Sequence, residues 1–223
     1  PYALAVDESC RKVKIGSMDI TAHESLTWKY ILNQLISGQD LGSRHVDWAM
    51  DEIMTGSTPE PILASFLTSL HMKGETSEEL GALARGMLAK AETIDLDVHA
   101  VDIVGTGGDQ QNTVNISTMA ALVIAGTGAT VVKHGNRAST SKSGSADVLE
   151  ALGINLNGDA ATLRRVFEQV GIAFLFANHM HPSMRFAAPV RRALGFPTAF
   201  NVLGPLTNPA RVQACAIGAS REE

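Results

Sequence analysis

The sequence predicts an α/β protein made of a small N-terminal α-helical domain and a larger α/β domain with a mainly parallel sheet. In the first hundred residues, apolar side chains recur at helical spacing between capping residues and glycines, whereas after residue 97 β-type runs alternate with helix-like stretches. With 223 residues, 45% of them hydrophobic, the chain can bury two modest cores. We expect an N-terminal extension over 1–24, the helical domain over 25–97 and the α/β domain over 98–223, with part of 181–195 packed on the helical domain.

The net charge of the chain argues against nucleic acid as a binding partner. Lys and Arg total 18 and Asp and Glu total 23, so the formal net charge is −5. We therefore expect no nucleic-acid partner, although a small anion needs only local donors. No apolar run approaches the roughly 18–20 residues that cross a bilayer, so we expect no membrane partner. Cys10 and Cys215 are far apart and read as reduced thiols of a cytoplasmic protein.

Four short amphipathic helices are expected in the first hundred residues, because each apolar segment lies between a capping residue and a glycine or follows a capping box. Such helices with short spacers are typical of a small bundle. The expected segments are Leu26 to Ile36 ending at Gly38, Ser43 as a cap to Gly56, Thr58 as a cap before Pro59 to Gly74, and a last helix opened by the capping box Thr76 to Glu79.

The second part of the chain alternates strands and helices, which implies a parallel sheet with crossover helices. The β-type runs cover 100–104, 129–132, 172–176 and 212–217. The helix-like stretches cover 117–126, 145–152 and 159–170.

A glycine-rich loop, GTGGD at 105–109, directly follows the first strand, and NIST at 115–118 precedes an apolar helix. Glycines let backbone N–H groups approach a ligand, and Ser117 or Thr118 would cap a helix whose N-terminus favours anions. The pattern matches neither a Walker A loop nor a dinucleotide-binding fingerprint. It predicts phosphate binding without a nucleoside triphosphate, and the alternative is an ordinary turn followed by an N-cap.

A second polar cluster, KHGNRASTS at 133–141, follows the second strand. Loops that leave parallel strands at their carboxyl ends face one cavity, so we expect it to lie beside the glycine loop. Lys133 and Arg137 can neutralise phosphates there, and the alternative is a solvated loop.

A third cluster contains His181, Arg185, Arg191 and Arg192. Pro182 suits the first turn of a helix that would place Arg185 and Arg191 about two turns apart, where two arginines could bind a carboxylate. A surface role is the stronger alternative for Arg185 and Arg192. His179 and His181 lack a third ligand nearby, which favours structural or surface roles over a metal site. Residues 201–209 are expected to form a rigid, turn-rich loop without chemistry.

Together these segments resemble the anthranilate phosphoribosyltransferases, of actinobacterial type. The matching motifs are GTGGD (105–109), NIST (115–118), KHGNRASTSKSGSADVLEALG (133–153), HPSMR (181–185) and FNVLGPLTNPA (200–210), in the family's order and spacing. The resemblance starts near Ser25 and implies a fold like those of nucleoside phosphorylases and phosphoribosyltransferases. It further implies transfer of the phosphoribosyl group from 5-phosphoribosyl 1-pyrophosphate to anthranilate, a step of tryptophan biosynthesis, with Mg²⁺ as cofactor and a homodimer formed through the helical domain.

The resemblance also implies site residues. For the phosphoribosyl donor they are Gly105, Gly108, Asp109, Thr113, Asn115, Ile116, Ser117, Thr118, Lys133, His134, Gly135, Asn136, Arg137, Ala138, Ser139, Thr140, Ser141 and Ser145. For anthranilate they are Gly105, Asn136 and Arg191, with Arg191 facing the carboxylate. Ser117 matches a magnesium ligand. No side chain is firmly assigned as catalytic, and Lys133 is expected to stabilise the leaving pyrophosphate.

Two departures from the family pattern qualify these expectations. Thr140 stands where a serine is usual, although the hydroxyl is kept. The family continues past Glu223 and carries its acidic magnesium ligands there, so the resemblance implies poor activity for a chain of this length. The competing interpretations are a pyrimidine nucleoside phosphorylase, whose loop reads KHSGR rather than KHGNR, and an inert or nucleic-acid-binding relative.

Overall fold

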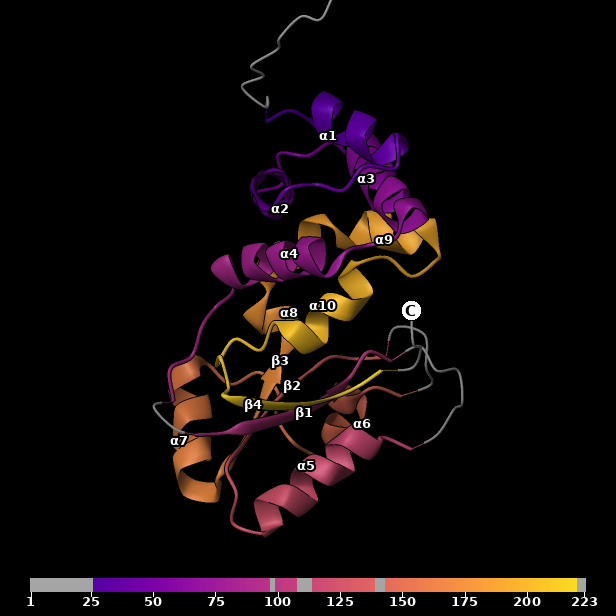
Figure 1. Ribbon diagram of the computed structural model, residues 1–223. Coiled ribbons are helices and arrows are strands. Elements are labelled where there is room, and N and C mark those ends of the chain that lie inside the picture. Colours follow the sequence, from indigo (N-terminus) through magenta and orange to yellow (C-terminus); the bar gives the residue numbers. More distant parts are fainter. Residues whose placement is uncertain (1–25, 97–98, 108–113, 139–142, 220–223) are drawn as a thin grey trace, which may run out of the picture.

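The computed structural model describes residues 26–96, 99–107, 114–138 and 143–219. Figure 1 shows the first four helices at one end and a parallel sheet at the other, with α9 and α10 between them. The predicted fold class, a helical N-terminal part followed by an α/β part, is confirmed. In the part of the chain that the structure describes, no helix is both long and apolar enough to span a membrane.

The helical part begins with α1 (Trp28–Ile36), α2 (Ser43–Met54), α3 (Glu60–Lys73) and α4 (Ser77–Ala89). The capping box is confirmed: the Thr76 hydroxyl accepts from the Glu79 N–H, and the Glu79 carboxylate accepts from the Thr76 N–H. The predicted cap of the third helix is wrong. Pro59 rather than Thr58 is the N-cap, because Pro59 has extended backbone (ψ 141°) and the helix starts one residue later.

The cap of the second helix also differs from the prediction. Gly42 is the N-cap and Ser43 is the first helical residue, so the serine hydroxyl does not cap this helix. Gly42 has extended backbone (φ −65°, ψ 150°), the conformation that an N-cap adopts.

The sheet contains β1 (Val101–Gly105), β2 (Val131–Gly135), β3 (Ile172–Phe176) and β4 (Ala214–Gly218), all parallel, in the order β3-β2-β1-β4. The helices α5 (Ile116–Gly126), α6 (Ser145–Ala151) and α7 (Ala160–Val170) connect the first three strands. Gly105 pairs with Gly218 and Gly135 with Phe176 in the register, so all four strands end at one edge. The predicted parallel sheet with crossover helices is confirmed.

The segment between β3 and β4 contains α8 (Ala177–Met180), the 3₁₀ helix η2 (Pro182–Phe186), α9 (Ala188–Leu194) and α10 (Phe200–Leu206). Pro182 begins η2 as expected, but η2 ends before Ala187, so Arg185 and Arg191 lie on different helices. The expected loop over 201–209 is helical up to Leu206 even though Pro205 lies inside the helix.

Two hydrophobic cores organise the molecule. The larger core contains apolar side chains of α1 to α4 and also takes Val190 from α9 and Phe200 and Leu203 from α10. The second core lies at the sheet and includes Val132, Leu175 and Phe167. The chain therefore returns to the helical core after it has formed three strands. The division into domains stays a prediction.

Candidate functional site at the carboxyl edge of the sheet

Lys133 places a buried ammonium group between β2 and the N-terminus of α5. Its Nζ donates to the Ile103 carbonyl at 2.5 Å and lies 3.3 Å from Ser117 Oγ. Burial lowers the pKa of Lys133, and the nearby carboxylate of Asp102 opposes that shift. The two sequence clusters that we expected to meet are joined at this point.

The residue that begins α5 differs from the prediction. Asn115 is the N-cap by its backbone, and neither Ser117 nor Thr118 caps the helix. The Asn115 side chain instead donates to the Gly144 carbonyl at 3.1 Å and reaches Ser143 Oγ at 3.4 Å. The segment before α5 is therefore tied to the segment before α6, across a gap of 29 residues in the sequence.

Arg137 points toward α6. Its guanidinium forms two contacts with the Glu150 carboxylate, at 2.5 and 2.7 Å, and lies 5.4 Å from the centre of the Phe176 ring. A hydrogen bond to Glu150 raises the pKa of Arg137. This bidentate pair fixes the guanidinium against α6 and occupies two of its donors.

His134 and Lys133 are neighbours on β2 and therefore project to opposite faces of the sheet. His134 Nδ1 lies 3.1 Å from the Gly204 carbonyl of α10, and its ring lies 5.1 Å from that of His181. Burial lowers the pKa of His134 to about 3, so the imidazole is neutral at physiological pH. His181 in turn contacts the Thr207 carbonyl through Nε2 at 3.0 Å.

Asp102 and Asn208 form a buried polar pair that the sequence did not indicate as functional. The Asn208 amide donates to Asp102 Oδ2 and to the Val132 carbonyl, both at 2.9 Å. Burial raises the pKa of Asp102, and the Asn208 hydrogen bond opposes this shift. An acidic residue in the middle of an apolar β-type run was the available signal, because a buried carboxylate needs a partner.

Arg191 lies on α9, beside the helical core. Its guanidinium contacts Asn201 Oδ1 at 3.5 Å and lies 5.8 Å from the Phe200 ring centre, and its Nε is buried without a partner. Burial lowers the pKa of Arg191. These contacts place Arg191 on the helical side of the molecule, and the side chain keeps an unused donor.

The other predicted residues lie along the same strand edge or outside the described residues. Gly105 and Gly135 end β1 and β2, Asn136 is exposed, and Ser145 begins α6. Ile116 begins α5, Thr118 is buried with an unpartnered hydroxyl, and Ala138 is half-buried. The residues outside the described part are Gly108, Asp109, Thr113, Ser139, Thr140 and Ser141.

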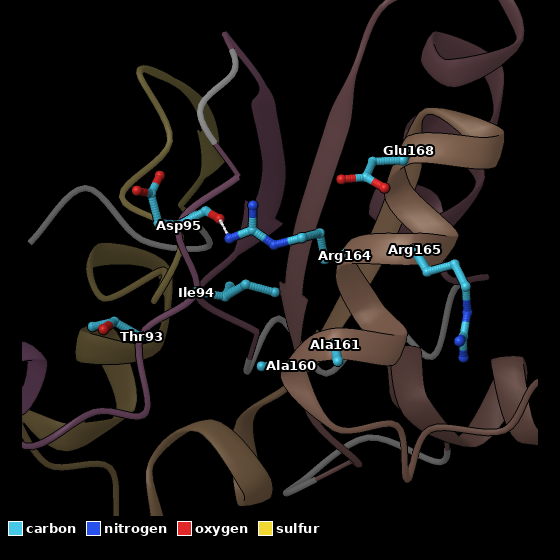
Figure 2. A pocket seen from close by; sticks show the side chains of 8 residues that line it. All are labelled: Thr93, Ile94, Asp95, Ala160, Ala161, Arg164, Arg165 and Glu168. Carbon is cyan, nitrogen blue, oxygen red and sulfur yellow. Dashed lines mark hydrogen bonds between the residues drawn. The ribbon is translucent and has the colours of Figure 1, made fainter.

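Two cavities lie away from these residues. One, of about 300 Å³, lies between the segment after α4 and helix α7. Figure 2 shows Arg164 reaching across it to the Asp95 carbonyl, while Arg165 points away. The other, of about 530 Å³, adjoins the first and includes Asp95, His99 and Arg211. Neither is lined by a predicted site residue, so these cavities do not mark the predicted site.

The described residues do not by themselves complete a magnesium site. Mg²⁺ in proteins takes oxygen ligands, usually one or two carboxylates together with substrate phosphates. Ser117 offers one hydroxyl oxygen, but that oxygen lies beside the Lys133 ammonium. Within the described ranges, no group of three or more His, Cys, Asp or Glu side chains could hold a metal ion.

Comparison with known proteins identifies relatives of both parts. Residues 29–91 match the helical bundle domain of a glycosyl transferase family, and residues 97–223 match its a/b domain. Two similar relatives are the anthranilate phosphoribosyltransferases of Arthrobacter sp. FB24, 57% identical, and Rhodococcus jostii RHA1, 55% identical. The alignments cover 88% and 86% of this chain but 56% and 53% of the relatives. The chain thus spans about half the length of the curated relatives it matches.

Solved structures agree with these relatives. The anthranilate phosphoribosyltransferase of Thermus thermophilus superposes with a TM-score of 0.80 at 43% identity, over 85% of this chain and 58% of that chain. The Saccharomyces cerevisiae enzyme, in complex with PRPP and Mg, gives 0.81 at 32% identity, over 90% and 61%. These similarities confirm the resemblance found in the sequence. The chain belongs to the glycosyl transferase family that combines a helical bundle domain with an α/β domain.

Proposed function

We propose that this chain takes part in transferring the phosphoribosyl group of 5-phosphoribosyl 1-pyrophosphate to anthranilate, which yields N-(5-phosphoribosyl)anthranilate and pyrophosphate. The reaction is the second step of tryptophan biosynthesis from chorismate. The observation that carries the proposal is the buried Lys133 ammonium beside Ser117, at the edge where the strands end. The names of the relatives, and structures of the yeast enzyme in complex with PRPP and Mg and with 4-fluoroanthranilate, support the choice of substrates.

The proposed reaction requires stabilisation of the leaving pyrophosphate and does not require a strong base. The aromatic amine is neutral at pH 7, and its lone pair forms the new bond to C1′ of the ribose. The bond from C1′ to oxygen breaks with its electron pair going to pyrophosphate, and the amine then releases a proton. Lys133 is suited to oppose the charge that builds on the leaving oxygens, because a buried ammonium acts in a low-dielectric site.

The anthranilate carboxylate would be bound by Arg191. This guanidinium is partly buried and has an unpartnered Nε, so a carboxylate would supply the missing acceptor. We assign Gly105 and Asn136 to the same substrate. The donor residues proposed from the sequence are retained, and Arg137 would reach a phosphate with the donors that its contact with Glu150 leaves available.

We also propose Mg²⁺ as cofactor, a homodimer formed through the helical part, and a cytoplasmic location. The support for Mg²⁺ is the yeast enzyme solved with PRPP and Mg. Because the described residues offer only the Ser117 hydroxyl, the remaining ligands would come from the diphosphate and from residues outside the described part. Sedimentation equilibrium tests the dimer: a single species of monomer mass at micromolar concentration contradicts it.

The function is tested by binding and by turnover. In excess Mg²⁺, calorimetric titration with 5-phosphoribosyl 1-pyrophosphate should show saturable uptake, and the fluorescence of added anthranilate should fall as the amine is consumed. Lys133→Gln should lower turnover by about 100-fold, the usual cost of one electrostatic contact in the transition state. Lys90→Gln is the matched control, because Lys90 is an exposed lysine at the end of α4 that pairs with Asp51 at 2.7 Å. Absence of donor uptake, or phosphorolysis of thymidine in its place, overturns the proposal.

A further inference from the structure

Gly144 is the point where three segments of the predicted donor site meet. A Cβ at this position would lie 2.3 Å from the Ala138 nitrogen and 2.5 Å from the Arg137 carbonyl carbon, so only glycine fits. The Gly144 carbonyl accepts from the Asn115 side chain at 3.1 Å. The loop before α5 and the segment after β2 are therefore both in contact with this glycine.

The Asp147 carboxylate holds this junction together. Its Oδ2 accepts from the Ala138 N–H at 2.9 Å and from the Gly144 N–H at 2.7 Å. Its Oδ1 lies 3.5 Å from Arg137 Nη1. One side chain thus joins the two residues that flank segment 139–143, and the Ala146 N–H adds a bond to the Asn136 carbonyl at 3.2 Å.

The hydrogen bonds matter more here than the ion pair. The Asp147 side chain is 32% exposed, so solvent screens its attraction to Arg137. Backbone donors to a carboxylate form charge-assisted bonds, which are stronger than bonds between neutral groups. The Ala138 N–H, and then the Gly144 N–H, lower the pKa of Asp147, so the carboxylate stays ionised at neutral pH.

We propose that Asp147 is a positioning residue for the phosphoribosyl donor: it fixes Ala138 and Gly144, and through Gly144 it holds the loop of Asn115 against the segment that follows Lys133. The inference rests on the proposed function, because it assigns a use to the loops named there. Asp147 touches no substrate in this scheme. It acts by keeping Ala138, Gly144 and Asn115 in one arrangement before the donor binds, which lowers the ordering cost of binding.

Two variants separate the hydrogen bonds from the charge. Asp147→Ala removes the acceptor of both backbone N–H groups. Asp147→Asn keeps one oxygen in nearly the same place but makes it neutral and turns an amide group toward Arg137. Asp159→Ala is the matched control, because Asp159 also accepts a backbone N–H at the start of a helix, that of Thr162 at 2.8 Å, on α7 away from the site.

The first measurement is independent of the ligand. In amide NMR spectra of the free chain, the Ala138 and Gly144 resonances should move in Asp147→Ala, move less in Asp147→Asn and stay in place in Asp159→Ala. The second measurement is calorimetry with 5-phosphoribosyl 1-pyrophosphate and Mg²⁺. The dissociation constant should rise about tenfold in Asp147→Ala and less in Asp147→Asn, as expected for the loss of charge-assisted hydrogen bonds.

The outcomes distinguish this inference from the proposed function. If the wild-type chain binds no donor, the proposed function fails, and the amide resonances still decide whether Asp147 holds the loop ends. If the donor binds equally well to wild type and to Asp147→Ala, the positioning role is wrong while the function stands. If Asp147→Ala does not fold, Asp147→Asn carries the test, with its melting temperature reported beside its dissociation constant.

Discussion

Glu79 is a carboxylate without exposed surface in the helical core. Its Oε1 accepts from the Leu41 N–H at 2.8 Å, while Oε2 accepts from the Thr76 N–H at 2.9 Å and from Lys73 Nζ at 2.8 Å. Lys73 also contacts Asp40 at 2.7 Å. The side chain thus satisfies donors from the segment before α2 and from the ends of α3 and α4, which fixes how these three elements meet.

We expect Glu79→Ala to lower the free energy of unfolding by about 3 kcal/mol, because it leaves the buried Leu41 N–H and the partly buried Thr76 N–H without their acceptor and removes one of the two carboxylates that pair with Lys73. The control is Glu78→Ala, an exposed neighbour in the same helical turn, which should change the free energy by about 0.5 kcal/mol or less. Urea unfolding followed by circular dichroism measures both. Equal effects of the two variants would show that the buried carboxylate contributes nothing beyond its helical position.

At the residue scale, sequence reasoning found local interactions and missed distant ones. The capping box of Thr76 and Glu79 is readable because its two residues are three positions apart. The contact of Glu79 with Leu41 spans 38 residues, and that of Asn208 with Asp102 spans 106. Nothing in the residues around Asn208 indicates its partner, so this part of the candidate site required the structure.

At the element scale, α2 and α4 pack closely because Gly86 has no side chain. A Cβ at Gly86 would lie 2.6 Å from Met50 Cβ, an atom that is fixed to the α2 backbone. A Cβ at Gly81, on the same helix, would lie 3.6 Å from the flexible end of Arg85. The two glycines of α4 therefore differ in the space around them although both lie in a helix interior.

Alanine at these two positions should change stability in opposite directions. Gly81→Ala should stabilise the chain by about 0.5–1 kcal/mol, because alanine has the higher helix propensity and meets only the movable end of Arg85. Gly86→Ala should destabilise it by about 1–3 kcal/mol, because overpacking against Met50 outweighs that gain. Differential scanning calorimetry measures both melting temperatures. A higher melting temperature for Gly86→Ala would contradict the close packing of α2 on α4.

The elements themselves were predictable where pattern and packing agree. The third strand is found at Ile172–Phe176 as expected. Its apolar run begins directly after Gly171, and its side chains are buried or half-buried in the structure. Helix α10 was missed because Gly204 and Pro205 argue against a helix. Packing decides this segment, since Leu203 is fully buried in the helical core.

At the scale of the whole molecule, Asn208 connects the end of α10 to the centre of the sheet. Besides its bonds to Asp102 and Val132, its Oδ1 accepts from the Ala210 N–H at 2.9 Å. The amide nitrogen therefore holds the segment after α10 against the sheet, while the oxygen closes a local turn within that segment.

Asn208→Ala should cost about 2–4 kcal/mol of unfolding free energy at neutral pH, because it removes the amide donor to the buried Asp102 carboxylate, which retains the longer bond from the His134 N–H at 3.3 Å, and also the donor to the Val132 carbonyl. The cost should shrink in acid. Burial already raises the pKa of Asp102, and loss of the amide donor raises it further, so the penalty is greatest above that pKa and falls as the carboxyl becomes protonated. Urea unfolding at about pH 7 and at about pH 4 measures the difference. The control is Asn157→Ala on the exposed surface, and a pH-independent cost would contradict an ionised Asp102.

The return of α9 and α10 to the core of the first four helices has a consequence for engineering this architecture. A gene cut between the helical and α/β parts would encode a bundle with an uncovered apolar gap where Val190, Phe200 and Leu203 belong. Such a piece would tend to aggregate. Chimaeras between relatives should therefore exchange 26–96 together with 187–203, since these two stretches share one hydrophobic core.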